Sequence, residues 1–123
     1  MTVLTGRHLV AVTACVSGVA HTYMAAERLE KICQQEKCSV LIETQGALGV
    51  ENALTDDDIR RADVVLLITD IELAESERFE NTRYVKCGIN AFLRDPQKVI
   101  GAVRKLLSAP QHTQIILDPA LFR

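Results

Sequence analysis

The chain has 123 residues, of which 48% are hydrophobic and 4% aromatic, and its net charge at pH 7 is −2. This composition indicates one globular domain with its own core, and the few aromatic side chains and lack of a basic stripe argue against nucleic-acid binding. Since no apolar run reaches the roughly 20 residues that cross a bilayer and residues 1–7 lack a signal-peptide pattern, we expect a cytoplasmic protein without direct membrane insertion.

The first half of the chain alternates strand and helix patterns. Residues 8–13 are predicted to form a strand covered on both faces, because apolar and β-branched residues follow one another without a polar break. Apolar residues recur at helical spacing over about residues 20–35, and a second strand is predicted over 39–44. Gly46 and Gly49 mark the loop that follows.

The second half continues this alternation. The pattern T-x-x-D at Thr55 predicts a capping box and a short helix that ends near Arg61. Residues 62–69 carry the strongest strand pattern and should lie at the centre of the sheet. A polar loop over residues 72–83 is predicted to lead into a short fourth strand over 84–86.

The last predicted helix starts at Asp95 and Pro96, which suit the N-cap and the first helical position, and ends near Ser108. This order of elements predicts an α/β fold: a three-layer α-β-α sandwich with a four-stranded parallel sheet, helices on both faces and a phosphate loop after the first strand. Residues 1–108 would form this domain. Residues 109–123 would form a tail that adds an edge strand, packs against a neighbour or is partly loose.

Cys15 stands where the first predicted strand ends, shortly before the long helix. Backbone N–H groups and the positive end of the helix dipole favour a thiolate or a bound anion at such a place. We therefore predict that Cys15 is a nucleophile and that the loop after it holds a phosphoryl group. The remaining cysteines, which lack zinc-site spacing, are interpreted as small apolar residues: Cys33, Cys38 and Cys87.

The segment from Cys15 has the form C-x₅-H-T, similar to the C-x₅-R-[ST] loop of cysteine-dependent phosphatases. His21 stands where that loop has its arginine. A histidine cannot offer the permanent, bidentate charge of a guanidinium. The site should therefore capture a phosphoryl group better than it hydrolyses one.

The same segment resembles the phosphocysteine loop of the fructose-type enzyme IIB components of the bacterial phosphoenolpyruvate-dependent sugar phosphotransferase system (PTS). That loop reads approximately C-P-T-G-[IV]-A-H-T, followed by an aromatic residue and M-A-A-E. The matching residues are Cys15, Gly18, Val19, Ala20, His21, Thr22, Tyr23, Met24, Ala25, Ala26 and Glu27. Further matches lie at residues 43–46, 54–55, 59, 62–65 and 78–79. Val16 and Ser17 replace the family's proline and threonine.

The resemblance implies a phosphotransferase whose Cys15 accepts phosphate from a phosphohistidine of an enzyme IIA or HPr-like domain. Cys15 would then pass the phosphate to a fructose-like sugar held by an enzyme IIC permease of the inner membrane. No metal or other cofactor is expected, because the donor phosphohistidine is already high in energy. The candidate phosphate-binding residues are Val16, Ser17, Gly18, Val19, Ala20, His21 and Thr22.

Four further residues are candidates for contact with a partner protein. Thr44 and Gln45 lie at the end of the second predicted strand and Asp70 ends the third, on the same edge of the sheet as Cys15. An ordinary loop role stays open for them, and a solvated surface is the default for Arg78 in its polar loop. Two other functions also stay open: a low-molecular-weight cysteine phosphatase, and a regulatory binding module that has lost transfer.

Overall fold

The computed structural model describes residues 4–15, 19–46, 49–71, 73, 75–110 and 113–117, with the backbone alone for residues 19 and 20. The strands are β1 (His8–Ala14), β2 (Ser39–Gly46), β3 (Gly49–Glu51), β4 (Val64–Thr69), β5 (Tyr84–Cys87) and β6 (Gln114–Ile116). The helices are α1 (Val19–Glu36), α2 (Asp56–Arg61), the 3₁₀ helix η1 (Ser76–Phe79), α3 (Ile89–Arg94) and α4 (Pro96–Leu107). The elements expected from the sequence are therefore present, and β3, η1 and α3 are additions to them.

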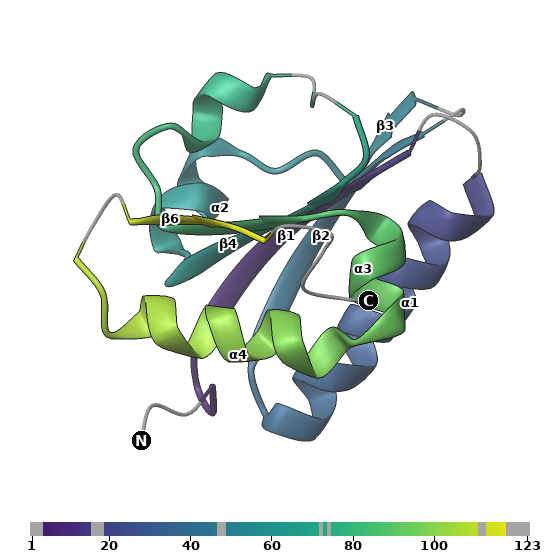
Figure 1. Ribbon diagram of the computed structural model, residues 1–123. Helices are drawn as coiled ribbons and strands as arrows, with labels where there is room; N and C mark the ends of the chain where they lie inside the picture. The colour runs from purple at the N-terminus through teal and green to yellow at the C-terminus, as the bar shows by residue number, and fades with distance from the viewer. Residues whose placement is uncertain are drawn as a thin grey trace.

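One sheet runs through the molecule in the order β3-β2-β1-β4-β5-β6 (Figure 1). Its central strands β2, β1, β4 and β5 are parallel, as predicted. The strand count was wrong, because two short strands extend the edges: β3 pairs antiparallel with β2, and β6 pairs parallel with β5. Gly46 and Gly49, which were predicted to mark a loop, are the last residue of β2 and the first residue of β3 and pair with each other. Gly49 has a φ of 89° that suits glycine.

Helices cover both faces of the sheet, as predicted. On one face, α1, α3 and α4 enclose the larger core, and on the other face α2 and η1 cover a smaller core (Figure 1). Every residue of β4 is buried, which fits its continuous apolar sequence and its place inside the sheet. Among the described residues, no helix is both long and apolar enough to cross a membrane.

The helix starts follow the signals in the sequence. The Thr55 hydroxyl accepts from the Asp58 N–H at 3.0 Å, and the Asp58 carboxylate accepts from the Thr55 N–H at 3.0 Å, which completes the predicted capping box. The Asp95 carboxylate accepts from the Lys98 N–H at 3.2 Å, and Pro96 occupies the first turn of α4. Local capping therefore fixes where both helices begin.

The connection to β6 has the opposite hand to the connection through α1. Both α1 and α4 pack on the same face, yet α1 leads from β1 toward the β3 edge and α4 leads from β5 toward the β6 edge. Crossovers between parallel strands are overwhelmingly right-handed. The tail thus supplies the edge strand that was one of its three predicted roles, through three paired residues and an unusual connection.

Candidate functional site

Cys15 directly follows β1, and α1 begins four residues later at Val19. At the end of β1, Ala14 lies opposite Gln45 of β2 and Thr69 of β4. The predicted place of Cys15, at the carboxyl end of an interior strand and before a long helix, is therefore confirmed. Ligands of doubly wound sheets bind at this edge.

Cys15 is more enclosed than an open nucleophile would be. Only 7% of the residue is exposed, and it belongs to the core between the sheet and α1. Reactive cysteines are ordinarily at least partly accessible. Any transfer through this sulfur therefore requires a path by which a phosphorus atom can reach it.

The predicted phosphate-binding residues divide into three groups. Val16, Ser17 and Gly18 lie outside the described residues, and Val19 and Ala20 supply the first backbone N–H groups of α1. His21 is exposed, whereas Thr22 is only 1% exposed. The first turn of α1 contains no acidic side chain. The leading N–H groups of an α-helix have no intrahelical acceptor, so this end of α1 favours an anion.

Three buried threonine hydroxyls surround this end of the sheet. Thr13 and Thr44 lie opposite each other in the β1–β2 register, and Thr22 is in the first turn of α1. By alternation along β1, Thr13 shares the α1-facing side with Cys15. All three residues are at most 4% exposed, and none of their hydroxyls has a hydrogen-bond partner within the part of the chain described.

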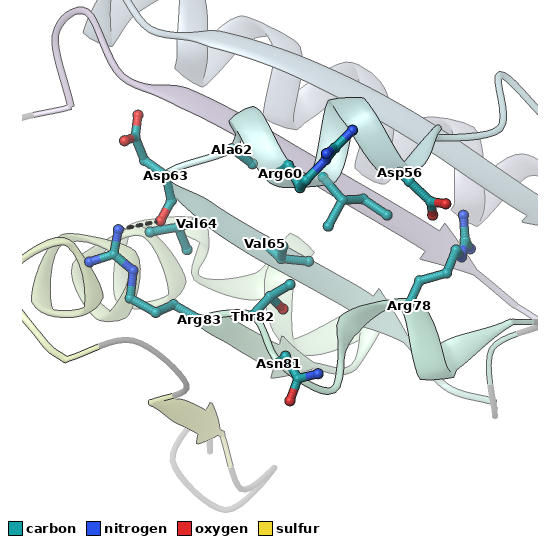
Figure 2. Close-up of a pocket in the computed structure, with 11 residues that line it drawn as sticks. Asp56, Arg60, Ala62, Asp63, Val64, Val65, Arg78, Asn81, Thr82 and Arg83 are labelled. Carbon is teal, nitrogen blue, oxygen red and sulfur yellow. Dashed lines mark hydrogen bonds between the residues drawn. The ribbon is translucent and has the colours of Figure 1, made fainter.

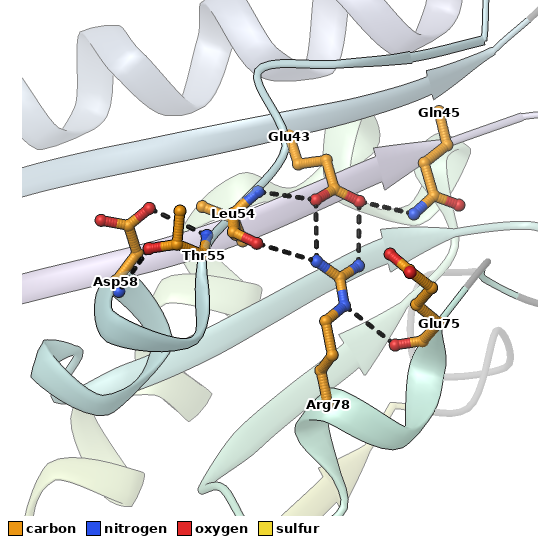
Figure 3. A network of polar contacts seen from close by, with 7 residues as sticks. All are labelled: Glu43, Gln45, Leu54, Thr55, Asp58, Glu75 and Arg78. Carbon is orange, nitrogen blue, oxygen red and sulfur yellow. Dashed lines mark hydrogen bonds and ion pairs between the residues drawn. The ribbon is translucent and has the colours of Figure 1, made fainter.

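On the α2 face of the sheet, Glu43 forms a buried ion pair with Arg78 (Figure 3). Two parallel bonds join them, from Nη1 to Oε1 and from Nη2 to Oε2, each 3.0 Å long. Glu43 also accepts from the Leu54 N–H at 2.8 Å and from Gln45 Nε2 at 2.6 Å. Arg78 donates to the carbonyl oxygens of Leu54 and Glu75. The pair thereby ties β2 to the segment before α2 and to η1.

The electrostatics of this pair follow from its hydrogen bonds. Burial opposes ionisation of Glu43, but the bonds from Arg78, Gln45 and the Leu54 N–H outweigh it and lower the pKa of Glu43. The hydrogen bond to Glu43 in turn raises the pKa of Arg78. Both groups are therefore charged at neutral pH, and the contact is a true salt bridge.

The prediction of a solvated surface at Arg78 was wrong. Its side chain is 12% exposed, because η1 turns it inward against β2 and its guanidinium lies 4.9 Å from the ring centre of Phe79. Glu43 was not singled out from the residues themselves. The available signal was a carboxylate within the apolar strand pattern Val-Leu-Ile-Glu, because a buried acid needs a cation.

The other candidate contact residues have structural partners. Asp70 is exposed, but its carboxylate accepts from the Ile89 N–H at 3.1 Å and so caps α3. Thr44 and Gln45 are part of β2 rather than of a loop, and both are buried. Of the four residues suggested for partner contact, only Asp70 is exposed at the edge where Cys15 lies.

A pocket of about 340 Å³ opens on the α2 face (Figure 2). It is lined by the start of β4 and by Arg60, Asn81 and Arg83, among others. The Arg83 guanidinium already has a structural partner there, because its Nη2 donates to the Asp63 carbonyl at 2.8 Å. Because the pocket lies at the amino end of β4 and Cys15 at the carboxyl edge, this hollow is separate from the cysteine site.

Comparisons with known proteins identify the family. Residues 10–102 match the family model described as "PTS system, Lactose/Cellobiose specific IIB subunit". The "PTS system fructose-like EIIB component 3" of Escherichia coli K12 is 75% identical over 111 residues, which cover 90% of this chain and 98% of that protein. An E. coli crystal structure described as "Predicted Fructose Specific IIB" superposes with a TM-score of 0.88 at 74% identity, over 91% of this chain and 99% of that one.

A fused relative adds a larger context. The "PTS system fructose-specific EIIB'BC component" of Xanthomonas campestris pv. campestris is 40% identical over 95 residues, which cover 77% of this chain but 16% of that protein. The sugars named by the family model and by the relatives differ, and the IIB unit is what they share. The chain thus belongs to the enzyme IIB family of the sugar phosphotransferase system, within its fructose-like group, and is a phosphotransferase component of that system.

Proposed function

We propose that Cys15 carries the phosphoryl group, accepting it from a phosphohistidine of an enzyme IIA or HPr-like domain. The observation that carries this proposal is the position of Cys15 between an interior strand and the first turn of α1, which holds no acidic side chain. Negative charge on a thiolate or on phosphoryl oxygens is favoured there. The same end of α1 would hold the phosphoryl group between the two transfers.

The first step is an in-line phosphoryl transfer. The Cys15 thiolate attacks phosphorus, the S–P bond forms, and the N–P bond breaks with its electron pair left on the donor imidazole. Backbone N–H groups at the start of α1 would stabilise the charge on the equatorial oxygens. Ser17, His21 and Thr22 are the candidate phosphate-binding residues whose side chains could add hydrogen bonds.

The second step passes the group to a sugar. A sugar hydroxyl oxygen attacks the phosphorus of phosphocysteine, and the S–P bond breaks to release the thiolate. The hydroxyl proton goes to a base on the partner that holds the sugar. The names of the relatives support a fructose-like sugar, and the EIIB'BC fusion supports a IIC partner. The chain would then work on the cytoplasmic side of an inner-membrane permease.

The test follows phosphate from labelled phosphoenolpyruvate through the general PTS proteins and a matched IIA. We expect one label per chain in the wild type and in Cys87→Ser, and none in Cys15→Ser. Cys87 is a matched control because it is also a buried cysteine at the carboxyl end of a strand. Label that persists in a folded Cys15→Ser variant would overturn the assignment.

Two alternatives predict different results in the same assay. A cysteine phosphatase would release inorganic phosphate steadily from an aryl phosphate through Cys15. A regulatory module would bind the IIA protein but take up no label. Addition of IIC membranes and sugar then tests the second step, because bound label should leave Cys15 and appear as sugar phosphate.

A further inference from the structure

Cys33 and Cys38 meet at the far end of α1 from Cys15. The helix spans 18 residues, so about 27 Å separates its two ends. Cys33 lies in the last turns of α1 and is 2% exposed, whereas Cys38 follows the helix and is half-buried. Both thiols are free in the structure. The mechanism proposed for phosphoryl transfer uses neither of them.

A Schellman motif brings these two residues together. Lys37 adopts a φ of 58°, the left-handed conformation that ends the helix. The Cys38 N–H then donates to the Cys33 carbonyl at 3.0 Å, and the Lys37 N–H donates to the Gln34 carbonyl at 3.3 Å. In this motif the side chains three positions before and just after the cap normally make an apolar contact. Here both positions hold a thiol.

The cap places the two cysteines at the two contacting positions of the motif, and Cys38 packs against the core that contains Cys33. Burial raises the pKa of the Cys33 thiol, and the neighbouring Cys38 raises it further, so Cys33 is protonated at neutral pH. Because Cys38 is half-buried and Cys33 is only 2% exposed, Cys38 is the thiol that a hydroperoxide reaches first, and Cys33 is placed to react with it next.

We propose that Cys33 and Cys38 form a reversible oxidation site, which a hydroperoxide converts into an intramolecular disulfide. The Cys38 thiolate attacks one peroxide oxygen, an S–O bond forms, and the O–O bond breaks to release hydroxide, which is protonated to water. The Cys33 sulfur then attacks the sulfenic sulfur, so that the S–S bond forms and the S–O bond breaks. The second water leaves with the Cys33 proton. The two thiols lose two electrons and the peroxide gains them.

The backbone holds the two residues close to each other. Disulfides join residues whose Cα atoms are about 4.4–6.8 Å apart, and the bond from the Cys38 N–H to the Cys33 carbonyl holds these residues within one turn. Neither residue is in the active-site half of α1. Oxidation should therefore link the carboxyl end of α1 covalently to the residue after its cap and leave the Cys15 thiol unchanged.

The test treats the folded Cys15→Ser chain with equimolar hydrogen peroxide, so that Cys33, Cys38 and Cys87 are the thiols present. We expect two thiols to be lost, a mass decrease of about 2 Da, and full recovery with dithiothreitol. Trypsin cleaves after Lys37, so peptides 32–37 and 38–60 should remain linked until reduction. The Tm should rise by about 5 °C on oxidation.

Matched variants separate the pair from other thiols. Adding Cys87→Ser should leave the linkage intact, whereas adding Cys33→Ser or Cys33→Ala should abolish it and leave a sulfenic acid on Cys38 that dimedone traps. The proposal is overturned if the folded chain keeps all three thiols while the urea-unfolded chain forms the linkage. It is equally overturned if peroxide oxidises Cys87 before Cys38.

Discussion

At the carboxyl end of β2, the buried polar side chains on the two faces of the strand differ in whether they have hydrogen-bond partners. On the α2 face, the carboxylate of Glu43 accepts hydrogen bonds from Arg78, Gln45 and the Leu54 N–H. On the α1 face, the neighbouring Thr44 and its β1 partner Thr13 are buried with hydroxyls that have no partner among the described residues. A satisfied buried network rigidifies a fold, whereas a buried hydroxyl without a partner costs free energy.

The comparison separates scaffold from site. The Glu43–Arg78 pair anchors β2 on the α2 face, and the threonine hydroxyls lie on the α1 face, where Cys15 also lies. We infer that the first face supplies stability, whereas the second face has buried hydroxyls without a described partner beside the cysteine proposed to carry the phosphoryl group. Substitutions on the two faces should therefore affect different measurements.

The largest effect is expected from Arg78→Leu. It leaves the 1% exposed carboxylate of Glu43 without a cation, which costs about 3–5 kcal/mol of unfolding free energy. Urea unfolding at pH 7 measures this loss. Arg60→Leu is the control, because its ion pair with Asp57 lies on the surface, and such pairs contribute at most about 1 kcal/mol. Equal losses in the two variants would contradict the structural role of the pair.

Acid should weaken the same pair. The pKa of Glu43 is lowered in the folded state, so its stabilisation is complete above its ordinary value of 4.5 and is lost as pH falls through the lowered value. The stability difference between the wild type and Glu43→Gln should therefore shrink as pH is reduced from 7 toward 3. A difference that stays constant over this range would show that the charge on Glu43 contributes little.

Gly88→Ala tests the contact between Asp70 and the start of α3. A Cβ at Gly88 would lie 2.9 Å from Asp70 Oδ1, so the carboxylate must move away from the Ile89 N–H. The expected cost is about 1 kcal/mol, the size of a lost helix cap. Gly101→Ala in α4 meets no atom within 4 Å and should instead gain up to about 1 kcal/mol. Thermal unfolding of both variants checks the two signs.

The smallest stability effect is expected on the α1 face. Removing the hydroxyl in Thr13→Val, Thr22→Val or Thr44→Val should change the unfolding free energy by less than about 1 kcal/mol or increase it, because no described hydrogen bond is lost. If the hydroxyls serve Cys15, the rate of labelling should still fall. Thr69→Val is the control, because its hydroxyl bonds to the Ile71 backbone and its loss should lower stability.

The sequence predicted the central elements and the place of Cys15. The continuous apolar run of β4 indicated an interior strand, and Thr55 and Asp95 marked the starts of α2 and α4 through local capping chemistry. These signals depend on residues within a few positions of one another. Local chemistry is sufficient to determine such features.

Tertiary structure decided the features that depend on distant residues. Arg78 and Glu43 are 35 positions apart, and neither position alone indicates a buried salt bridge. The antiparallel β3 and the parallel β6 each pair only three residues, so their sequences carry little strand pattern and the neighbouring strand selects them. The backbone bond from Cys38 to Cys33 likewise required the left-handed turn at Lys37, because spacing alone does not determine how a helix ends.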